Sequence, residues 1–137
     1  MSQTIKAVNT GGMAFKIEQD GHAFTVDAGP SVGGKDQGPR PKALLLSGLA
    51  GCTGMDVASI LSKMKMPYDT MTIEIDANLT DQHPMVYDKI HLKYIFKGDN
   101  LDPGKIEKAI NLSQDKYCGD TAMLAKTADI TYEVLTE

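Results

Sequence analysis

The sequence predicts an α+β protein in which mainly antiparallel sheets surround one long buried central helix. Residues 41–65 form the longest apolar and small-residue segment, whereas the segments on both sides alternate apolar and polar side chains with a period of two. Strands and helices in separate runs are typical of the α+β class. The 137 residues are enough to bury a real core, so a single domain over residues 1–137 is expected.

The first 28 residues are expected to form β structure that contains a hairpin. Apolar side chains alternate through residues 13–17, and the alternation returns at Phe24 and Val26. Asp20 and Gly21 both tolerate positive φ, which predicts the turn between the two strands. The following residues 29–40 contain four glycines and two prolines, so they are expected to form a loop.

Residues 41–65 are expected to form one helix, because Pro41 suits a first helical position and Pro67 ends the run. Apolar side chains surround its axis on nearly all sides, which predicts burial on nearly all sides. Three glycines cost about 1 kcal/mol each relative to alanine, so close approach of another backbone is expected. These are Gly48, Gly51 and Gly54. A second subunit would complete the burial of this helix, so we expect a homodimer.

After the helix, the alternation over residues 71–79 and 86–96 predicts two antiparallel strands with one solvent-exposed face. Asp102 is suited to cap a second helix, and Pro103 is suited to its first position. Helical spacing of apolar residues continues to about Lys116.

Cys118 and Gly119 break the second helix, and a short third helix with Asp120 in its cap is expected to follow. Alternation over residues 130–134 predicts a last strand. The complete expected order is β-hairpin, long helix, β-hairpin, helix, short helix and strand.

Composition excludes several classes of function. The net charge is −4, so no basic surface for nucleic acid is expected. The N-terminal ten residues lack the apolar core of a signal peptide, and Ser47, Asp56 and Ser59 interrupt the long helix, so neither secretion nor a membrane span is expected. We therefore expect a cytoplasmic protein. Its two cysteines do not form a structural disulfide framework and are more often inert, metal-bound or redox-active.

Cys52, at the middle of the long helix, is the first candidate nucleophile. It lies about three turns from the helix start, beyond the reach of the terminal dipole. Asp56 shares its helical face and disfavours a thiolate. Activation must therefore come from a cation elsewhere, and Arg40 is favoured over Lys35 because guanidinium stays charged and binds oxyanions in a fork. A small buried hydrophobic side chain is the alternative reading of Cys52.

Cys118 is the second candidate, because it precedes a predicted helix start, a position that lowers a thiol pKa. If the two thiols meet, they can reduce a peroxide through a sulfenic acid and a disulfide. No metal site is expected: the histidines show no metal-ligand spacing, and they are His22, His83 and His91. No cofactor is expected either, because the glycine-rich loop lacks the Lys-Ser/Thr of a phosphate loop.

Two segments resemble the OsmC/Ohr family, specifically its small OsmC-like redox-protein branch. They are residues 38–67, GPRPKALLLSGLAGCTGMDVASILSKMKMP, and residues 101–124, LDPGKIEKAINLSQDKYCGDTAML. The resemblance implies an intertwined homodimer with active sites at the subunit interface. It also implies reduction of organic hydroperoxides, with thiols or lipoyl dithiols as the reductant.

Carried over by position, the resemblance places Cys52 as the peroxidatic cysteine and Cys118 as the resolving cysteine. The family also uses an arginine from the loop before the helix, here Arg40 or Lys35, and a glutamate near the helix start. Ala43 stands at the glutamate's place. A charge-assisted hydrogen bond that would fix the arginine is therefore lost.

Three functions follow from these residues. The first is a thiol-dependent peroxidase that acts on organic hydroperoxides. The second is a non-catalytic binding or redox-responsive protein with the same fold, which the missing glutamate favours. The third, a cysteine acyltransferase, needs a histidine beside Cys52.

Overall fold

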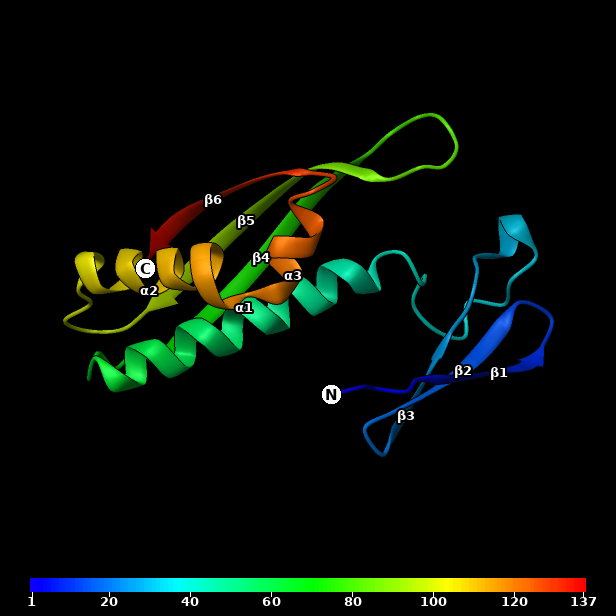
Figure 1. The fold of residues 1–137 in the computed structure, drawn as a ribbon, viewed down its shortest axis with the longest axis horizontal. Coiled ribbons are helices and arrows are strands. Elements are labelled where there is room, and N and C mark those ends of the chain that lie inside the picture. Colours follow the sequence, from blue (N-terminus) through cyan, green and yellow to red (C-terminus); the bar gives the residue numbers. More distant parts are fainter. The chain divides into compact units, whose positions relative to one another are not determined.

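The computed structural model describes residues 1–137, which form two compact units, residues 1–47 and 48–137 (Figure 1). The boundary falls inside the long helix, near its start. That the two units fold together as one domain stays a prediction from chain length. The α+β class with a long central helix is confirmed, and each unit carries its own three-stranded sheet.

The first unit is an antiparallel sheet in the order β1-β2-β3. The expected hairpin is β2–β3, and its turn residues Asp20 and Gly21 have φ of 52° and 77°. β1 was not distinguished within the N-terminal β region, because residues 6–11 carry little apolar alternation. The strands are β1 (Lys6–Gly11), β2 (Ala14–Gln19) and β3 (His22–Val26).

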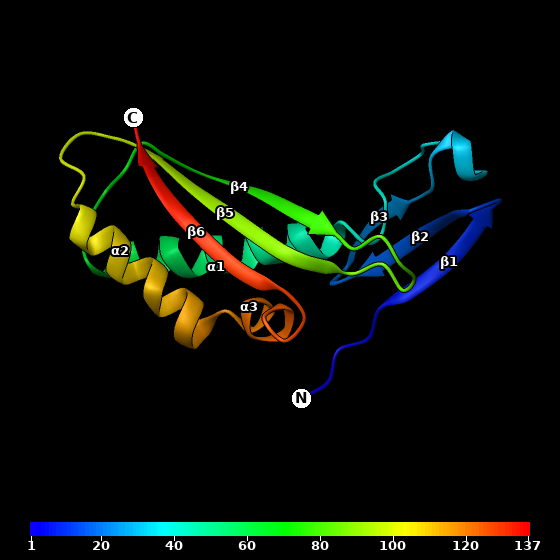
Figure 2. The same cartoon turned by 90° about the horizontal axis from the view of Figure 1, so that it is seen from above.

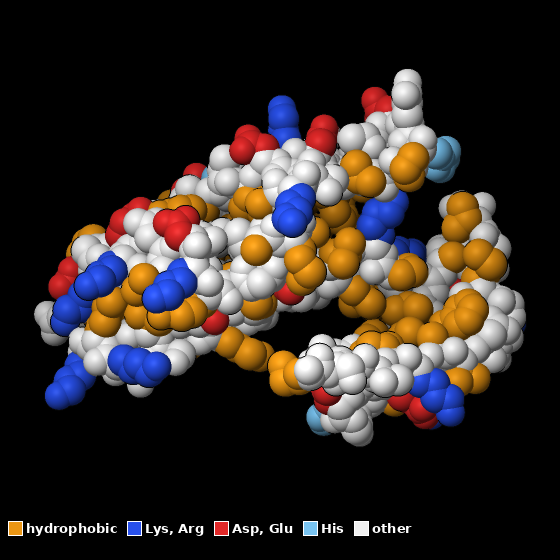
Figure 3. Space-filling view, viewed as in Figure 1, with side chains coloured by type: hydrophobic (Ala, Val, Ile, Leu, Met, Phe, Trp, Pro, Cys, Tyr) orange, Lys and Arg blue, Asp and Glu red, His pale blue; other side chains and the backbone are white.

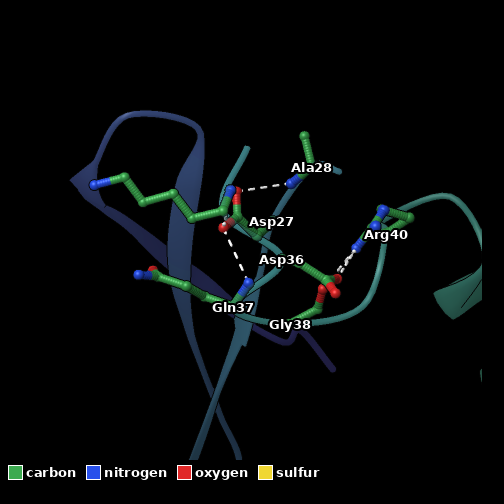
Figure 4. Close-up of polar contacts among 7 residues, drawn as sticks. Asp27, Ala28, Asp36, Gln37, Gly38 and Arg40 are labelled. Carbon is green, nitrogen blue, oxygen red and sulfur yellow. Dashed lines mark hydrogen bonds and ion pairs between the residues drawn. The ribbon is translucent and has the colours of Figure 1, made fainter. Parts of the chain in front are cut away.

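The loop after β3 is held by one buried carboxylate, that of Asp27 (Figure 4). Its Oδ1 accepts from the Ala28 N–H at 2.7 Å, and its Oδ2 accepts from the N–H groups of Lys35 at 3.2 Å and Gln37 at 3.1 Å. A short 3₁₀ turn, η1 (Pro30–Val32), lies within the loop. The sequence showed almost no apolar residue that could hold this loop against the fold. The Asp27 carboxylate holds it instead, through hydrogen bonds to backbone N–H groups.

The second unit places α1 (Leu44–Lys63) and two further helices against one face of the sheet β4-β5-β6 (Figure 2). The middle strand buries every second residue, and these are Ile90, Leu92, Tyr94 and Phe96. The remaining elements are β4 (Thr70–Leu79), β5 (Tyr87–Lys97), α2 (Pro103–Leu112), the π-helical turn η2 (Ser113–Tyr117), α3 (Gly119–Leu124) and β6 (Asp129–Thr136).

β4 and β5 form the expected antiparallel pair, whereas β6 runs parallel to β5. The two helices between β5 and β6 return the chain to the starting end of β5, as parallel pairing requires. The prediction of mainly antiparallel sheets is confirmed, with the β5–β6 pair as the one exception. The parallel direction of β6 could not be predicted, because alternation along a strand carries no information on its direction.

The long helix begins at Leu44, later than Pro41 suggested, and residues 41–43 form a preceding turn. Its fully buried residues recur every fourth position and form a single stripe: Leu49, Thr53, Val57 and Leu61. Other apolar side chains are exposed in one chain, Leu45 by 54% and Met55 by 76%. A single chain therefore does not bury this helix on nearly all sides. Figure 3 shows hydrophobic side chains on the surface of the chain.

By length and composition alone, α1 is long and apolar enough to cross a membrane. The core helix of a soluble protein meets the same two criteria. Its buried stripe packs on the sheet, since the Thr53 hydroxyl contacts that of Tyr94. This helix is a core helix of the fold.

Two helix starts follow different rules. Asp102 caps α2 as expected, with its Oδ1 accepting from the N–H groups of Gly104 at 3.0 Å and Lys105 at 3.3 Å. For α3 the expected Asp120 cap is wrong: Cys118 is the N-cap, and its Sγ accepts from the Thr121 N–H at 3.4 Å. The π-helical turn before Cys118 shifts the helix start to the cysteine itself.

Asp27→Asn is expected to destabilise the loop over residues 28–37, because an amide cannot accept all three backbone donors. Burial alone would raise the pKa of Asp27, but those donors and the charge of Arg40 outweigh it and lower the pKa. The carboxylate's stabilisation is therefore complete above the unfolded value of about 3.9 and is lost as pH falls through the lower folded value.

Hydrogen exchange of these loop amides at neutral pH measures the effect, and acid unfolding measures the pH dependence. Asp20→Asn is the matched control, because its side chain is exposed and asparagine tolerates the same positive φ. Equal loop protection in Asp27→Asn and wild type would contradict the anchoring role.

Candidate functional site

The two cysteines lie close together in the second unit. The sulfur atoms of Cys52 and Cys118 and a carboxylate oxygen of Asp56 all lie within 4.8 Å of one another. Cys52 comes from the middle of α1 and is half-buried, whereas Cys118, between η2 and α3, is only 3% exposed. Both are free thiols. The sequence left open whether they meet, and the fold brings them together.

A buried network of hydroxyls fixes α1 beside this cluster. Thr53 Oγ1 lies 2.7 Å from the hydroxyl of Tyr94 on β5 and 2.8 Å from Ser113 Oγ at the end of α2. Ser113 Oγ donates to Asp56 Oδ2 at 2.9 Å, and Gln114 Nε2 donates to the Tyr94 hydroxyl at 2.7 Å. These hydrogen bonds therefore join α1, β5 and the π-helical turn η2 around the Thr53 hydroxyl.

The phenol of Tyr94 belongs to this network and is fully buried. Burial raises its pKa, while the hydrogen bonds that the phenol oxygen makes with Thr53 and Gln114 oppose that rise. The phenol stays neutral and serves as a structural hydrogen-bonding group.

The surroundings of Cys52 favour the protonated thiol. Burial raises its pKa, and so do the neighbouring Cys118 and the charge of Asp120, whereas the backbone N–H of Asp120 acts in the opposite direction. Asp120 faces α1, since its Oδ2 lies 3.0 Å from the point where a Cβ at Gly48 would be. The sequence had assigned the unfavourable carboxylate to Asp56, whereas the carboxylate that raises the pKa of Cys52 in the structure is that of Asp120.

The predicted cations belong to the first unit. Arg40 Nη1 pairs with Asp36 Oδ1 at 2.6 Å and also donates to the Gly38 carbonyl at 3.1 Å (Figure 4). The Lys35 backbone N–H is the group that contacts Asp27. A role for Arg40 or Lys35 toward Cys52 stays a prediction.

The histidines do not form a site with the thiols. His91 on β5 lies 2.7 Å from Thr131 Oγ1 and 3.4 Å from Glu133 Oε2. No histidine is among the groups that shift the pKa of Cys52. Within the second unit, the surroundings of Cys52 therefore give no support to the third function, a cysteine acyltransferase.

Several residues of the site were not found from the sequence, namely Thr53, Tyr94, Ser113, Gln114 and Asp120 as a neighbour of Cys52. Their hydrogen bonds join residues far apart in the chain. The one available signal was a threonine at the buried position of an otherwise apolar helical stripe.

Comparisons with known proteins support an OsmC-like fold for this chain. Residues 34–133 match the family model described as OsmC-like protein. Protein YhfA of Escherichia coli (strain K12) is 30% identical over 127 residues, which cover 90% of this chain and 92% of that protein. A crystal structure of a hypothetical protein from Aquifex aeolicus VF5 is 26% identical with a TM-score of 0.84, covering 100% of this chain and 98% of that one.

An organic hydroperoxide resistance protein OsmC from Legionella pneumophila has a TM-score of 0.73 at 14% identity, covering 98% of this chain and 97% of that one. At this identity the comparison establishes the shared fold.

Thr53→Val is expected to lower the free energy of unfolding by about 1–3 kcal/mol, because the buried hydroxyls of Tyr94 and Ser113 lose their shared partner. Chemical denaturation measures the change. Ser59→Ala, on the exposed side of the same helix, is the control and should shift stability by less than about 0.5 kcal/mol. An equal effect of both substitutions would contradict the role given to the Thr53 network.

Proposed function

Because this chain belongs to the OsmC/Ohr family, we propose that it reduces organic hydroperoxides with its two cysteines. The observation that carries the proposal is the approach of Cys52 and Cys118, whose sulfurs lie within 4.8 Å. A disulfide needs the sulfurs to close to about 2.05 Å, which is a small movement for side chains at a helix start and on a neighbouring helix. The same fold occurs in a protein named an organic hydroperoxide resistance protein.

The cycle uses the more exposed thiol first. The Cys52 thiolate attacks the outer peroxide oxygen, the O–O bond breaks, and the alkoxide takes a proton to leave as alcohol. Cys52 becomes a sulfenic acid. The Cys118 sulfur then attacks the Cys52 sulfur, water leaves, and a disulfide forms. A dithiol reductant, of lipoyl or similar type, supplies two electrons and two protons and restores both thiols.

The first step needs positive charge, because the pKa of Cys52 is raised by burial and by its acidic neighbour. We propose that Arg40 supplies this charge in the active protein, with Lys35 as the second choice. Release from Asp36 would be needed, since that carboxylate now holds the guanidinium. Ala43 offers no carboxylate to orient the freed arginine.

A second candidate function is a redox-responsive protein without efficient turnover. Two observations favour it: Ala43 at the helix entrance and the raised pKa of Cys52. Such a protein would form the same disulfide slowly and would use it as a signal. Rate separates the two functions, since both use the same thiols.

We further propose a cytoplasmic homodimer. Apolar side chains remain exposed in each unit, including Met55 on α1 and Phe15 and Phe24 in the first sheet. Single exposed apolar residues are ordinary in a monomer. An apolar helix with only one buried stripe, however, needs a second subunit to cover its remaining faces. The same holds for a three-stranded sheet that is exposed on both faces.

Cys52→Ser is expected to abolish consumption of an alkyl hydroperoxide in the presence of a dithiol, because serine cannot form the sulfenic acid. Cys118→Ser is expected to keep one rapid oxidation and then to accumulate sulfenic acid, since no second thiol condenses with it. Peroxide consumption and intact mass measure both outcomes.

Wild type should lose two hydrogens within the chain when treated with one equivalent of hydroperoxide. Slow formation of this disulfide without turnover would favour the redox-responsive function. If wild type and Cys52→Ser consume several hydroperoxides at the same rate, the peroxidase proposal is wrong.

Met55→Glu is expected to shift the protein from dimer to monomer at micromolar concentration, because it places a charge in the proposed interface. Sedimentation velocity measures the assembly state. Met123→Glu is the matched control, because Met123 is similarly exposed, by 65%, on the short helix α3. A monomeric wild type, or dissociation of both variants alike, would contradict an interface along α1.

A further inference from the structure

We propose that Cys52, Cys118 and Asp56 form a binding site for a thiophilic divalent cation of the zinc and cadmium type. The proposal goes beyond the peroxidase function and does not depend on it. Two sulfurs and one carboxylate oxygen already lie within 4.8 Å of one another, with all three side chains half-buried or buried. Thiolate and carboxylate are established ligands of zinc.

The geometry is close to what a tetrahedral ion needs. With zinc–sulfur bonds of about 2.3 Å, two sulfurs on one zinc lie about 3.8 Å apart. The present spacing exceeds this by at most about 1 Å, given the 4.8 Å bound. Rotation of the half-buried Cys52 side chain can supply this adjustment, whereas Cys118 is held by the Thr121 N–H.

The carboxylate ligand is already oriented by an outer partner. Ser113 Oγ donates to Asp56 Oδ2 at 2.9 Å, and Ser113 is itself fixed through Thr53. Such partners hold metal-binding carboxylates in position and are an ordinary part of metal sites. The hydroxyl network therefore prepares the third ligand without a metal being present.

Charge around the thiols favours a cation. Asp56 and Asp120 approach from α1 and α3, and Asp120 adds negative potential at Cys52. This potential opposes a bare thiolate and attracts a divalent ion. Binding would release one proton from each thiol to solvent and leave one coordination position for water.

A buried polar group beside the cluster has no partner. The Thr121 hydroxyl, three residues after Cys118, is 6% exposed and makes no hydrogen bond. Buried hydroxyls of this kind commonly mark a place for an ordered water or an ion. The Thr121 hydroxyl is thus a buried polar group that the protein alone leaves unpaired.

A bound cation would hold both thiols as ligands and so prevent the disulfide. The site then acts as a reversible block on the oxidation of Cys52. The sequence analysis expected no metal site because the three histidines show no metal-ligand spacing. The two cysteines are far apart in the chain, so their spacing gave no signal either.

The test is a titration of the reduced full-length protein with Co²⁺ under anaerobic conditions, followed by displacement with Zn²⁺. We expect one Co²⁺ per chain, with thiolate-to-cobalt charge-transfer absorption that zinc removes. Cys52→Ser, Cys118→Ser and Asp56→Asn should each weaken binding by at least about tenfold, since loss of even an outer partner costs that much. Asp115→Asn is the matched control, an exposed carboxylate in the same region, and should bind as wild type does.

Absence of charge-transfer absorption with reduced wild type would overturn the site. Binding that both cysteine variants retain would assign the metal to some other surface, and Asp56→Asn that matches Asp115→Asn would remove the carboxylate from the ligand set. Circular dichroism of each variant excludes loss of the fold as the cause. No hydroperoxide enters this titration, so its outcome is separate from that of the peroxidase assay.

Discussion

The hydroxyl of Thr53 is the contact on which the arrangement of the site depends. It is fully buried and joins α1 to Tyr94 of the sheet and to Ser113 at the end of α2. A helix can otherwise rotate on a sheet with little change in apolar burial, whereas a buried hydroxyl must meet its partners. Because Cys52 is adjacent to Thr53, fixing one fixes the direction of the other.

The π-helical turn Ser113–Tyr117 makes the matching adjustment on the other side of the pair. In an α-helix each residue advances about 100° around the axis, so a wider turn changes the direction of every residue after it. Cys118 comes directly after this turn and caps α3, with its sulfur toward the Thr121 N–H. The two thiols therefore meet through two local constraints that share Ser113.

Most of the fold follows from local patterns in the sequence, such as alternation in the strands, the turn at Asp20 and the cap at Asp102. The parallel direction of β6 and the anchoring of the loop by Asp27 do not, because each depends on partners distant in the chain or on backbone groups. For the site, residue type identified Cys52 and Cys118 as candidates. Their proximity depends on long-range hydrogen bonds, which no spacing in the sequence encodes.

The two proposals for the thiols make the same electrostatic demand. Burial and Asp120 hold Cys52 in its protonated form, so either a peroxide reaction or a dithiol metal site needs positive charge beside the sulfurs. An arginine satisfies the demand while leaving the sulfur free to react, whereas a metal ion satisfies it by occupying the sulfur. Under the proposed function, Ala43 leaves Arg40 without a carboxylate to orient it, so we expect the arginine to be the weaker competitor. The acidic surroundings of the pair favour protonated thiols. Under the two proposals, these thiols become reactive beside Arg40 and are blocked when they bind a metal ion.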